Sequence, residues 1–130
     1  MSGPMFAGLF VNTERVDDAA EVTLVGEFDL ESVAPVTEAL TATLAPPPPR
    51  LVLIDLSNLT FISGTGVSTL LGALAEAIYR GADLRLYGPR HRIVRRAMAV
   101  TGADHLLRIY PTHADAVRDT ARLTTWPGRR

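Results

Sequence analysis

The sequence predicts an α/β domain in which helices pack on a mixed β-sheet, with the element order ββαβαβαβα. Short apolar runs typical of strands alternate along the chain with segments whose apolar residues recur every three or four positions, as they do in helices. One run, residues 51–54, is apolar at every position and indicates a central strand covered on both faces. A chain of 130 residues is long enough for one domain with its own core.

The first third of the chain predicts two strands and a helix. Residues 9–16 and 21–28 have the composition of strands, and residues 17–19 form the turn between them. A helix is predicted over residues 32–44, because its apolar residues recur at helical spacing. The prolines of residues 46–49 cannot continue a helix. We interpret them as a stiff connector rather than as a polyproline ligand for a partner.

The next helix has the clearest pattern in the sequence. Its apolar residues form one continuous stripe, made of Val67, Leu70, Leu71, Leu74 and Ile78. Other positions near its start are small and uncharged, namely Ser68, Thr69, Gly72 and Ala73. Solvated helix faces usually carry more charge, so this small face indicates close contact, either with a partner or with another part of the domain.

The last third predicts two further strand–helix units. A strand at residues 84–87 leads to a helix that opens at Gly88-Pro89, ends at Gly102 and turns four residues inward: Ile93, Val94, Ala97 and Met98. A strand follows at residues 106–110. Thr112 and Asp115 then form a pattern similar to a capping box, which predicts a final helix. Residues 123–130 are predicted to be a tail.

Charge and composition exclude several classes of protein. The absence of cysteine excludes a disulfide framework and thiolate chemistry. Residues 1–79 carry ten acidic residues and two arginines, whereas residues 80–130 carry eleven arginines and four acidic residues. These arginines are not interleaved with aromatic residues, so no nucleic-acid partner is expected. No apolar run reaches the roughly 20 residues of a membrane span, and residues 1–10 lack a secretory signal pattern. We therefore expect a cytoplasmic protein without membrane insertion.

The turn Ser63-Gly64-Thr65-Gly66 lies between a strand and a helix, where phosphate-binding and nucleophile sites often form. Val67 stands where a Walker A loop needs lysine, Thr69 stands where a dinucleotide loop needs its third glycine, and the GxSxG motif is absent. The three histidines lack the spacing of metal ligands. We therefore expect no catalytic residue, no metal and no cofactor, and interpret the protein as a binding module rather than an enzyme.

Five short motifs, taken in their order and spacing, resemble those of the STAS domain: Gly26-Glu27-Phe28-Asp29, Asp55-Leu56-Ser57, the segment from Phe61 to Val67, Thr101-Gly102-Ala103-Asp104, and Leu107-Arg108-Ile109-Tyr110-Pro111. More closely, the chain resembles the bacterial anti-sigma factor antagonists. The resemblance covers about residues 8–122, which we take as the domain.

This resemblance implies a protein-binding regulator. In the family, the antagonist binds an anti-sigma factor, a serine kinase with a histidine-kinase-like ATPase fold, and thereby frees a sigma factor for transcription. The kinase phosphorylates a serine in an Asp-Ser-Ser/Thr-Gly turn, and the phosphate breaks the complex through its charge. The implied partner is therefore an anti-sigma factor, and the chain is expected to be a monomer or a weak homodimer without enzymatic activity.

The sequence departs from the family pattern at the phosphoacceptor. Alignment places Ser63 at the family's aspartate, Gly64 at its acceptor serine and Thr65 at the following residue. Either the phosphate switch is lost, or Ser63 or Thr65 is phosphorylated instead. Thr65 is also suited to be the N-cap of the helix. By resemblance, and with the small helix face as support, the expected partner-binding residues are Asp29, Ser63, Gly64, Thr65, Gly66, Ser68, Thr69 and Gly72.

Two other functions of STAS domains remain open from the sequence. One is a subunit of a transport or lipid-trafficking complex, which would contact an ATPase. The other is a module that binds a small ligand or nucleotide, with the turn at Gly64 and Thr65 around a phosphate. The lack of a basic residue between Arg50 and Arg80 in the sequence argues against the second.

Overall fold

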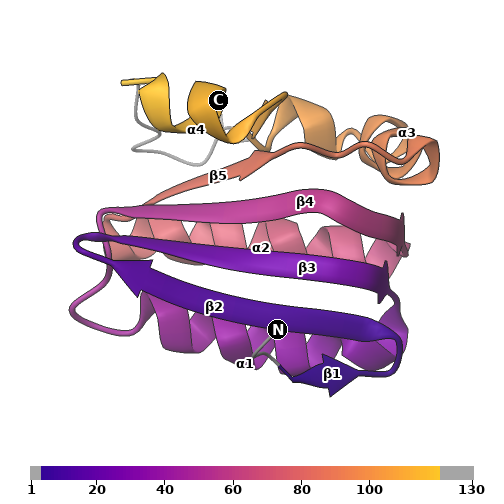
Figure 1. Cartoon of the computed structure of the whole chain (residues 1–130), viewed down its shortest axis with the longest axis horizontal. Coiled ribbons are helices and arrows are strands. Elements are labelled where there is room, and N and C mark those ends of the chain that lie inside the picture. The colour runs from indigo at the N-terminus through magenta and orange to yellow at the C-terminus, as the bar shows by residue number, and fades with distance from the viewer. Residues whose placement is uncertain (1–3, 121–130) are drawn as a thin grey trace.

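The computed structural model describes residues 4–120 and contains one six-stranded β-sheet packed against helices (Figure 1). The strands are β1 (Met5–Phe6), β2 (Leu9–Val16), β3 (Ala19–Phe28), β4 (Leu51–Ile62), β5 (Asp83–Tyr87) and β6 (Ile109–Tyr110). The helices are α1 (Val33–Leu44), α2 (Gly64–Arg80), α3 (Arg92–Val100) and α4 (His113–Arg118), with 3₁₀ turns at η1 (Leu30–Ser32) and η2 (Ala103–His105). The predicted fold class, a mixed sheet with helices packed on it, is confirmed.

The strands lie across the sheet in the order in which they follow in the sequence. β1, β2 and β3 pair antiparallel, whereas β3, β4, β5 and β6 pair parallel. Parallel neighbours need a crossover connection, and α1, α2 and α3 provide these crossovers. The parallel strands therefore finish on the same side of the molecule. We call this side, where Phe28, Ile62 and Tyr87 end their strands, the carboxyl end of the sheet.

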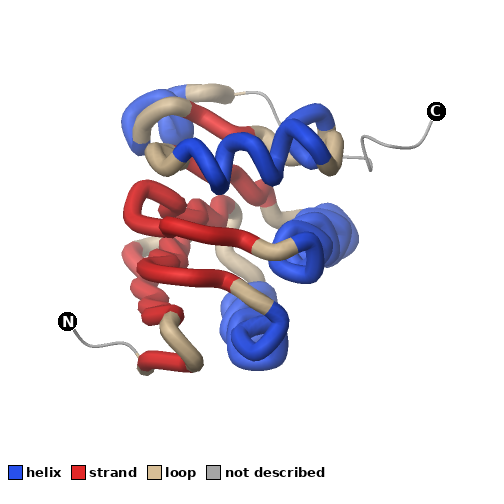
Figure 2. The backbone as a smooth tube through the Cα atoms, turned by 90° about the vertical axis from the view of Figure 1, so that its right-hand side faces the viewer, coloured by secondary structure: helices blue, strands red, loops and turns tan. Residues whose placement is uncertain are grey.

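α1 and α2 cover one face of the sheet, and α4 lies on the opposite face (Figure 2). Alternation along β3 explains this arrangement, because Val22, Leu24 and Phe28 are buried in the main core beneath α1 and α2. A smaller apolar cluster lies on the other face, where α4 packs Ala116 against Leu51, Leu53 and Tyr87. The continuously apolar run at residues 51–54 is thus covered on both sides, as predicted.

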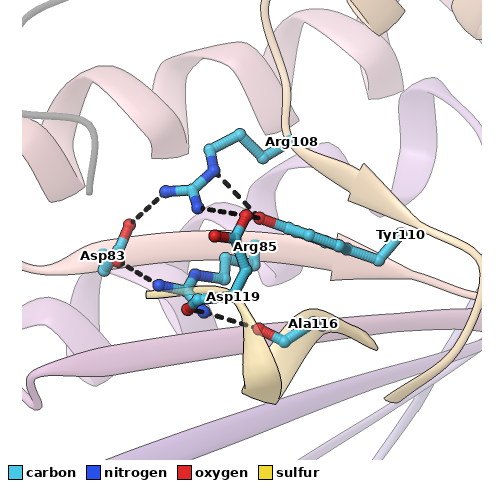
Figure 3. A network of polar contacts seen from close by, with 6 residues as sticks. All are labelled: Asp83, Arg85, Arg108, Tyr110, Ala116 and Asp119. Carbon is cyan, nitrogen blue, oxygen red and sulfur yellow. Dashed lines mark hydrogen bonds and ion pairs between the residues drawn. The ribbon is translucent and has the colours of Figure 1, made fainter. Parts of the chain in front are cut away.

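A buried ion pair holds the end of α4 on the sheet (Figure 3). Asp83 and Arg85 are both almost fully buried on β5, and Arg85 Nη2 lies 2.7 Å from Asp83 Oδ2. Arg85 Nη1 donates hydrogen bonds of 2.6 Å to the backbone carbonyl oxygens of Ala116 and Asp119. Since Ala116 is in α4 and Asp119 follows it, one guanidinium ties the last helix to β5.

Arg108 extends this network toward solvent. Its guanidinium bridges Asp83 Oδ1 at 3.1 Å and Asp119 Oδ2 at 3.0 Å. Tyr110 donates its hydroxyl proton to Asp119 Oδ2 at 2.5 Å. Burial, together with this bond to a carboxylate, raises the pKa of Tyr110. Arg108 directly precedes β6 and Tyr110 is its last residue, so the network also fixes the last strand to the sheet (Figure 3).

Several predicted elements need correction. The strand predicted at residues 51–54 continues to Ile62, because β4 pairs with β3 from Leu51 to Ile62, with two irregularities in the ladder. β3 begins two residues earlier than predicted, at Ala19. The strand predicted at residues 106–110 is reduced to Ile109–Tyr110, because the 3₁₀ turn η2 ends at His105 and residues 106–108 form a turn that leads into the strand. β1 was not predicted at all, since a two-residue strand has no periodicity.

Ile93 is also wrongly predicted to point inward. Its side chain is 56% exposed, whereas Val94 and Met98 are buried. Val94 and Met98 are four residues apart and define the buried side of α3, so a residue one position earlier than Val94 falls outside it. The predicted tail, residues 123–130, lies outside the described residues, as do the last positions of the predicted domain.

Candidate functional site

The ends of β3 and β4 bring two predicted site residues together at the carboxyl end of the sheet. Phe28 and Ile62 are partners in the parallel ladder, and the backbone N–H of Ser63 donates a 2.9 Å hydrogen bond to the Phe28 carbonyl oxygen. Asp29 and Ser63, which follow these partners, therefore leave the sheet side by side. Asp29 caps η1, because its Oδ1 accepts a hydrogen bond from the backbone N–H of Glu31 at 3.0 Å.

Ser63, and not Thr65, is the N-cap of α2. Ser63 has extended backbone angles, and its Oγ accepts a 3.1 Å hydrogen bond from the backbone N–H of Gly66. The interpretation of Thr65 as the N-cap is therefore wrong, because α2 begins at Gly64 and Thr65 is already in its first turn. The Ser63 and Thr65 hydroxyls lie 2.8 Å apart and hydrogen bond to each other. Thr65 is exposed, and Ser63 is half-buried.

The two glycines of this turn are in opposite environments. Gly64 is exposed, and a Cβ added to it would have no neighbour within 4 Å. Gly66 is buried, and a Cβ there would lie 2.8 Å from Ile62 Cγ1 and 3.1 Å from the Phe28 carbonyl oxygen. Gly66 therefore lets α2 approach the ends of β3 and β4 closely. Its role in the site is to allow this short distance between the helix and the strand ends.

Gly66→Ala should lower the free energy of unfolding by about 1–3 kcal/mol, because the new methyl group collides with the strand ends beneath the helix. Gly64→Ala is the matched control in the same turn. It should raise the free energy of unfolding by about 0.4–1 kcal/mol, since the side chain enters open space and restricts the unfolded chain. Urea unfolding of both variants measures the difference. Equal stability of the two variants would contradict the close packing at Gly66.

The outer face of α2 carries the remaining predicted site residues. Ser68 and Gly72 are exposed, and Thr69 is half-buried with its hydroxyl donating to the Thr65 carbonyl oxygen at 2.8 Å. Ala73, which the sequence placed on the same small face, is buried in the core. A groove of about 280 Å³ runs between α1 and α2, and its lining includes Thr69 and Gly72. Part of the small face thus packs near α1, and part of it is open to solvent.

Sequence reasoning missed two exposed apolar residues near this turn. Leu30 directly follows Asp29 and is 69% exposed, and Phe61 precedes Ile62 and is 38% exposed. Large apolar side chains in such positions are typical of interaction surfaces when they gather in one place. The sequence contained a sign that Leu30 is exposed, because Leu30 lies outside the periodic apolar pattern of the helix that follows it.

The described residues hold no cluster of side chains suited to binding a metal ion. Residues 4–120 contain no group of three or more His, Cys, Asp or Glu side chains that could hold a metal ion. Within the same range, no helix combines the length and the hydropathy needed to cross a membrane. The site presents an exposed helix N-terminus whose own first turns carry no charged side chain, with Asp29 beside it, and such a surface suits contact with another molecule.

Comparison with known proteins identifies the family. The STAS domain model matches residues 10–116. The anti-sigma-F factor antagonist RsfB of Mycobacterium tuberculosis is 32% identical over 98 residues, which cover 75% of this chain and 78% of RsfB. The crystal structure of an anti-sigma factor antagonist from Mycobacterium paratuberculosis superposes with a TM-score of 0.71 at 26% identity, covering 84% of this chain and 91% of that one.

A more distant structure shows the same fold. SpoIIAA, an anti-sigma factor antagonist solved in its unphosphorylated form, superposes with a TM-score of 0.69 at 21% identity, covering 82% of this chain and 92% of SpoIIAA. The family-model match spans most of the chain, and it agrees with the sequence relative and with the arrangement of strands and helices. The chain therefore belongs to the STAS domain family, and the relatives described above are named as anti-sigma factor antagonists.

Proposed function

We propose that this protein is an anti-sigma factor antagonist, which binds an anti-sigma factor through the carboxyl end of its sheet and so frees a sigma factor for transcription. The observation that carries the proposal is the outer face of α2, which is exposed and uncharged at Gly64, Thr65, Ser68 and Gly72. The names of the relatives support the same function. The protein acts by binding, in the cytoplasm, rather than as an enzyme.

The geometry of this face favours contact with a folded partner. Ser68 and Gly72 have little or no side chain, so a partner element can approach the α2 backbone closely. Asp29 and Leu30 lie beside the first turn of α2 and enlarge the surface. Stable protein–protein interfaces bury about 800 Å² on each partner, and the α2 face together with the ends of β3 and β4 is a contiguous surface of the kind such an interface needs.

The partner in this proposal is a serine kinase of the histidine-kinase-like ATPase fold. In the family this kinase phosphorylates the antagonist and so ends binding, and we propose that this chain has lost that phosphorylation site. Gly64 stands at the position of the family's acceptor serine and has no hydroxyl. The two neighbouring hydroxyls are already engaged, because Ser63 Oγ caps Gly66 and hydrogen bonds to Thr65 Oγ1. A kinase must place its acceptor hydroxyl with sub-ångström to ångström accuracy. The chain is therefore proposed to be a constitutive antagonist.

The direct test is a binding assay against each purified anti-sigma factor of the organism that encodes the chain. The chain is immobilised, the anti-sigma factors are titrated by biolayer interferometry, and the released sigma factor is followed by size-exclusion chromatography. We expect one anti-sigma factor to bind and its sigma factor to be displaced. Binding to none of them, by a chain with an intact melting transition, would contradict the proposed function.

Introducing the family's acceptor should create a phosphorylation site. Gly64→Ser adds a hydroxyl at the first residue of α2, where an added Cβ has no neighbouring atom within 4 Å. We expect stoichiometric phosphate on this variant after incubation with the bound anti-sigma kinase and ATP, and no phosphate on the wild type. Phosphorylation should weaken binding to the kinase about 10-fold or more, because a phosphate adds a charge of about −1.5 to −2 at the interface.

Mass spectrometry of the phosphorylated peptides separates the alternatives. Ser63→Ala and Thr65→Ala, each in the wild-type background, serve as controls for the two natural hydroxyls. Phosphate on wild-type Ser63 or Thr65 would show that the switch has moved by one residue. A folded Gly64→Ser protein that binds the kinase and stays unphosphorylated would contradict the alignment of Gly64 with the acceptor.

A further inference from the structure

The arginines of α3 lie near the N-terminus of the helix, where a positive charge is unfavourable. Arg92, Arg95 and Arg96 occupy the first turn and a half of α3, which has no acidic residue in its first turn and no basic residue in its last. Arg90 and His91 precede the helix, and no acidic residue occurs between Gly88 and Ala103. The N-terminus of a helix carries the positive end of its dipole, so each cation there is unfavourable by about 0.3–1 kcal/mol. Stability of the fold does not explain this placement.

Two of these arginines form no ion pair within the described part of the chain. Arg95 donates from its Nη1 to the backbone carbonyl oxygen of Arg90 and folds back over the loop. Arg92 and Arg96 are exposed and form no ion pair with any residue in the range 4–120. Their guanidinium groups therefore project into solvent from a helix whose buried side is made by Val94 and Met98.

The same exposed side of α3 also presents apolar residues. Ile93 is 56% exposed and Val100 is 73% exposed. Ile93, Arg96 and Val100 are spaced three and four residues apart, so they form one continuous strip along the helix. Arginine and large apolar residues together are typical of protein–protein interfaces, whereas acidic side chains and lysine are depleted there.

This strip is next to the proposed docking surface. Figure 2 looks onto the carboxyl end of the sheet, where the starts of α1 and α2 face the viewer and α3 lies across the same side of the molecule. α3 packs against both β4 and α2. A partner that contacts the first turns of α2 would therefore extend over α3.

We propose that α3 is a second contact element for the anti-sigma factor and that it binds an acidic surface on that partner through Arg92 and Arg96, with Ile93 and Val100 packing beside them. This inference rests on the proposed function. A membrane is a poorer fit because arginine interrupts the apolar strip, and a single-stranded nucleic acid is a poorer fit because the segment from Gly88 to Val100 contains no Phe, Tyr or Trp on which bases could stack.

The test reverses the charge of the helix and follows stability and binding together. In Arg92→Glu/Arg96→Glu, the melting temperature should stay the same or rise, since acidic residues suit a helix N-terminus. The association rate with the anti-sigma factor identified in the binding assay should fall about 10-fold, and its dependence on salt should weaken, because charge complementarity acts mainly on association. Arg15→Glu/Arg50→Glu is the matched control, since it makes the same change in net charge at two exposed residues on the opposite end of the sheet.

The outcomes separate this inference from the proposed function. If the wild type binds no anti-sigma factor, the proposed function is contradicted, and so is the inference that rests on it. If the wild type binds and both double variants associate equally fast, only the inference fails. A 30-base-pair DNA duplex and phosphatidylserine vesicles are added as probes. Binding of wild type to either, lost in the α3 variant while association with the anti-sigma factor is unchanged, would assign α3 to that other ligand and overturn the inference.

Discussion

Arg85→Ala should lower the free energy of unfolding by about 3–5 kcal/mol, because it removes one partner of a buried ion pair. The side chains of Arg85 and Asp83 are 3% and 2% exposed. Without the guanidinium, Asp83 keeps the ion pair with Arg108 within residues 4–120, and the carbonyl oxygens of Ala116 and Asp119 lose the donor that holds α4 on the sheet. A buried carboxylate and two carbonyl groups then lack much of their hydrogen bonding.

An ion pair on the surface of α4 provides the control for Arg85→Ala. Arg118 lies 2.5 Å from Asp115, but its side chain is 74% exposed. Arg118→Ala should change the free energy of unfolding by less than about 0.5 kcal/mol, since exposed pairs gain little over their hydration. Urea unfolding followed by far-ultraviolet circular dichroism measures both variants. A loss below about 1 kcal/mol in Arg85→Ala would show that the network contributes little to stability.

Gly72→Arg and Thr69→Arg should each weaken binding to the anti-sigma factor at least about 100-fold, or about 2.7 kcal/mol. Gly72 is exposed with no atom within 4 Å of an added Cβ, and Thr69 is half-buried beside it. A long charged side chain at either position holds a partner away from the α2 backbone, and its charge is left unpaired in the contact. The fold should not respond, because the buried stripe of Val67, Leu70 and Leu74 is on another side of the helix.

Thr13→Arg is the matched control, since it introduces the same side chain at an exposed residue of β2. Titration calorimetry with the anti-sigma factor gives the affinities, and thermal unfolding reports on the fold. We expect Thr13→Arg to bind like the wild type. If both α2 variants keep the wild-type affinity and melting temperature, the anti-sigma factor binds to a different surface.

The sequence by itself determined the elements whose pattern is local. In the predicted stripe of α2, Val67, Leu70 and Leu74 are buried and Leu71 and Ile78 are partly buried against the core, because residues three and four apart must share one side of a helix. Thr112 caps α4 and accepts from the backbone N–H of Asp115, as the capping pattern indicates, because both groups lie within one turn. Gly102 adopts a left-handed conformation after α3, which is the local geometry of a helix end.

Only the tertiary structure decided features that depend on contacts between distant segments. Asp29 and Ser63 are 34 positions apart in the sequence and become neighbours because β3 and β4 pair in parallel up to the partners Phe28 and Ile62. The network of Asp83, Arg85 and Asp119 likewise joins strand and helix, and no local pattern marks these charges as buried. The exposure of Ile93 depends on how far α3 is rotated against β4, which its own apolar spacing left open. A local pattern fixes which side of an element is apolar, but pairing and packing partners are chosen by the free energy of the whole assembled core, which a short stretch of sequence does not contain.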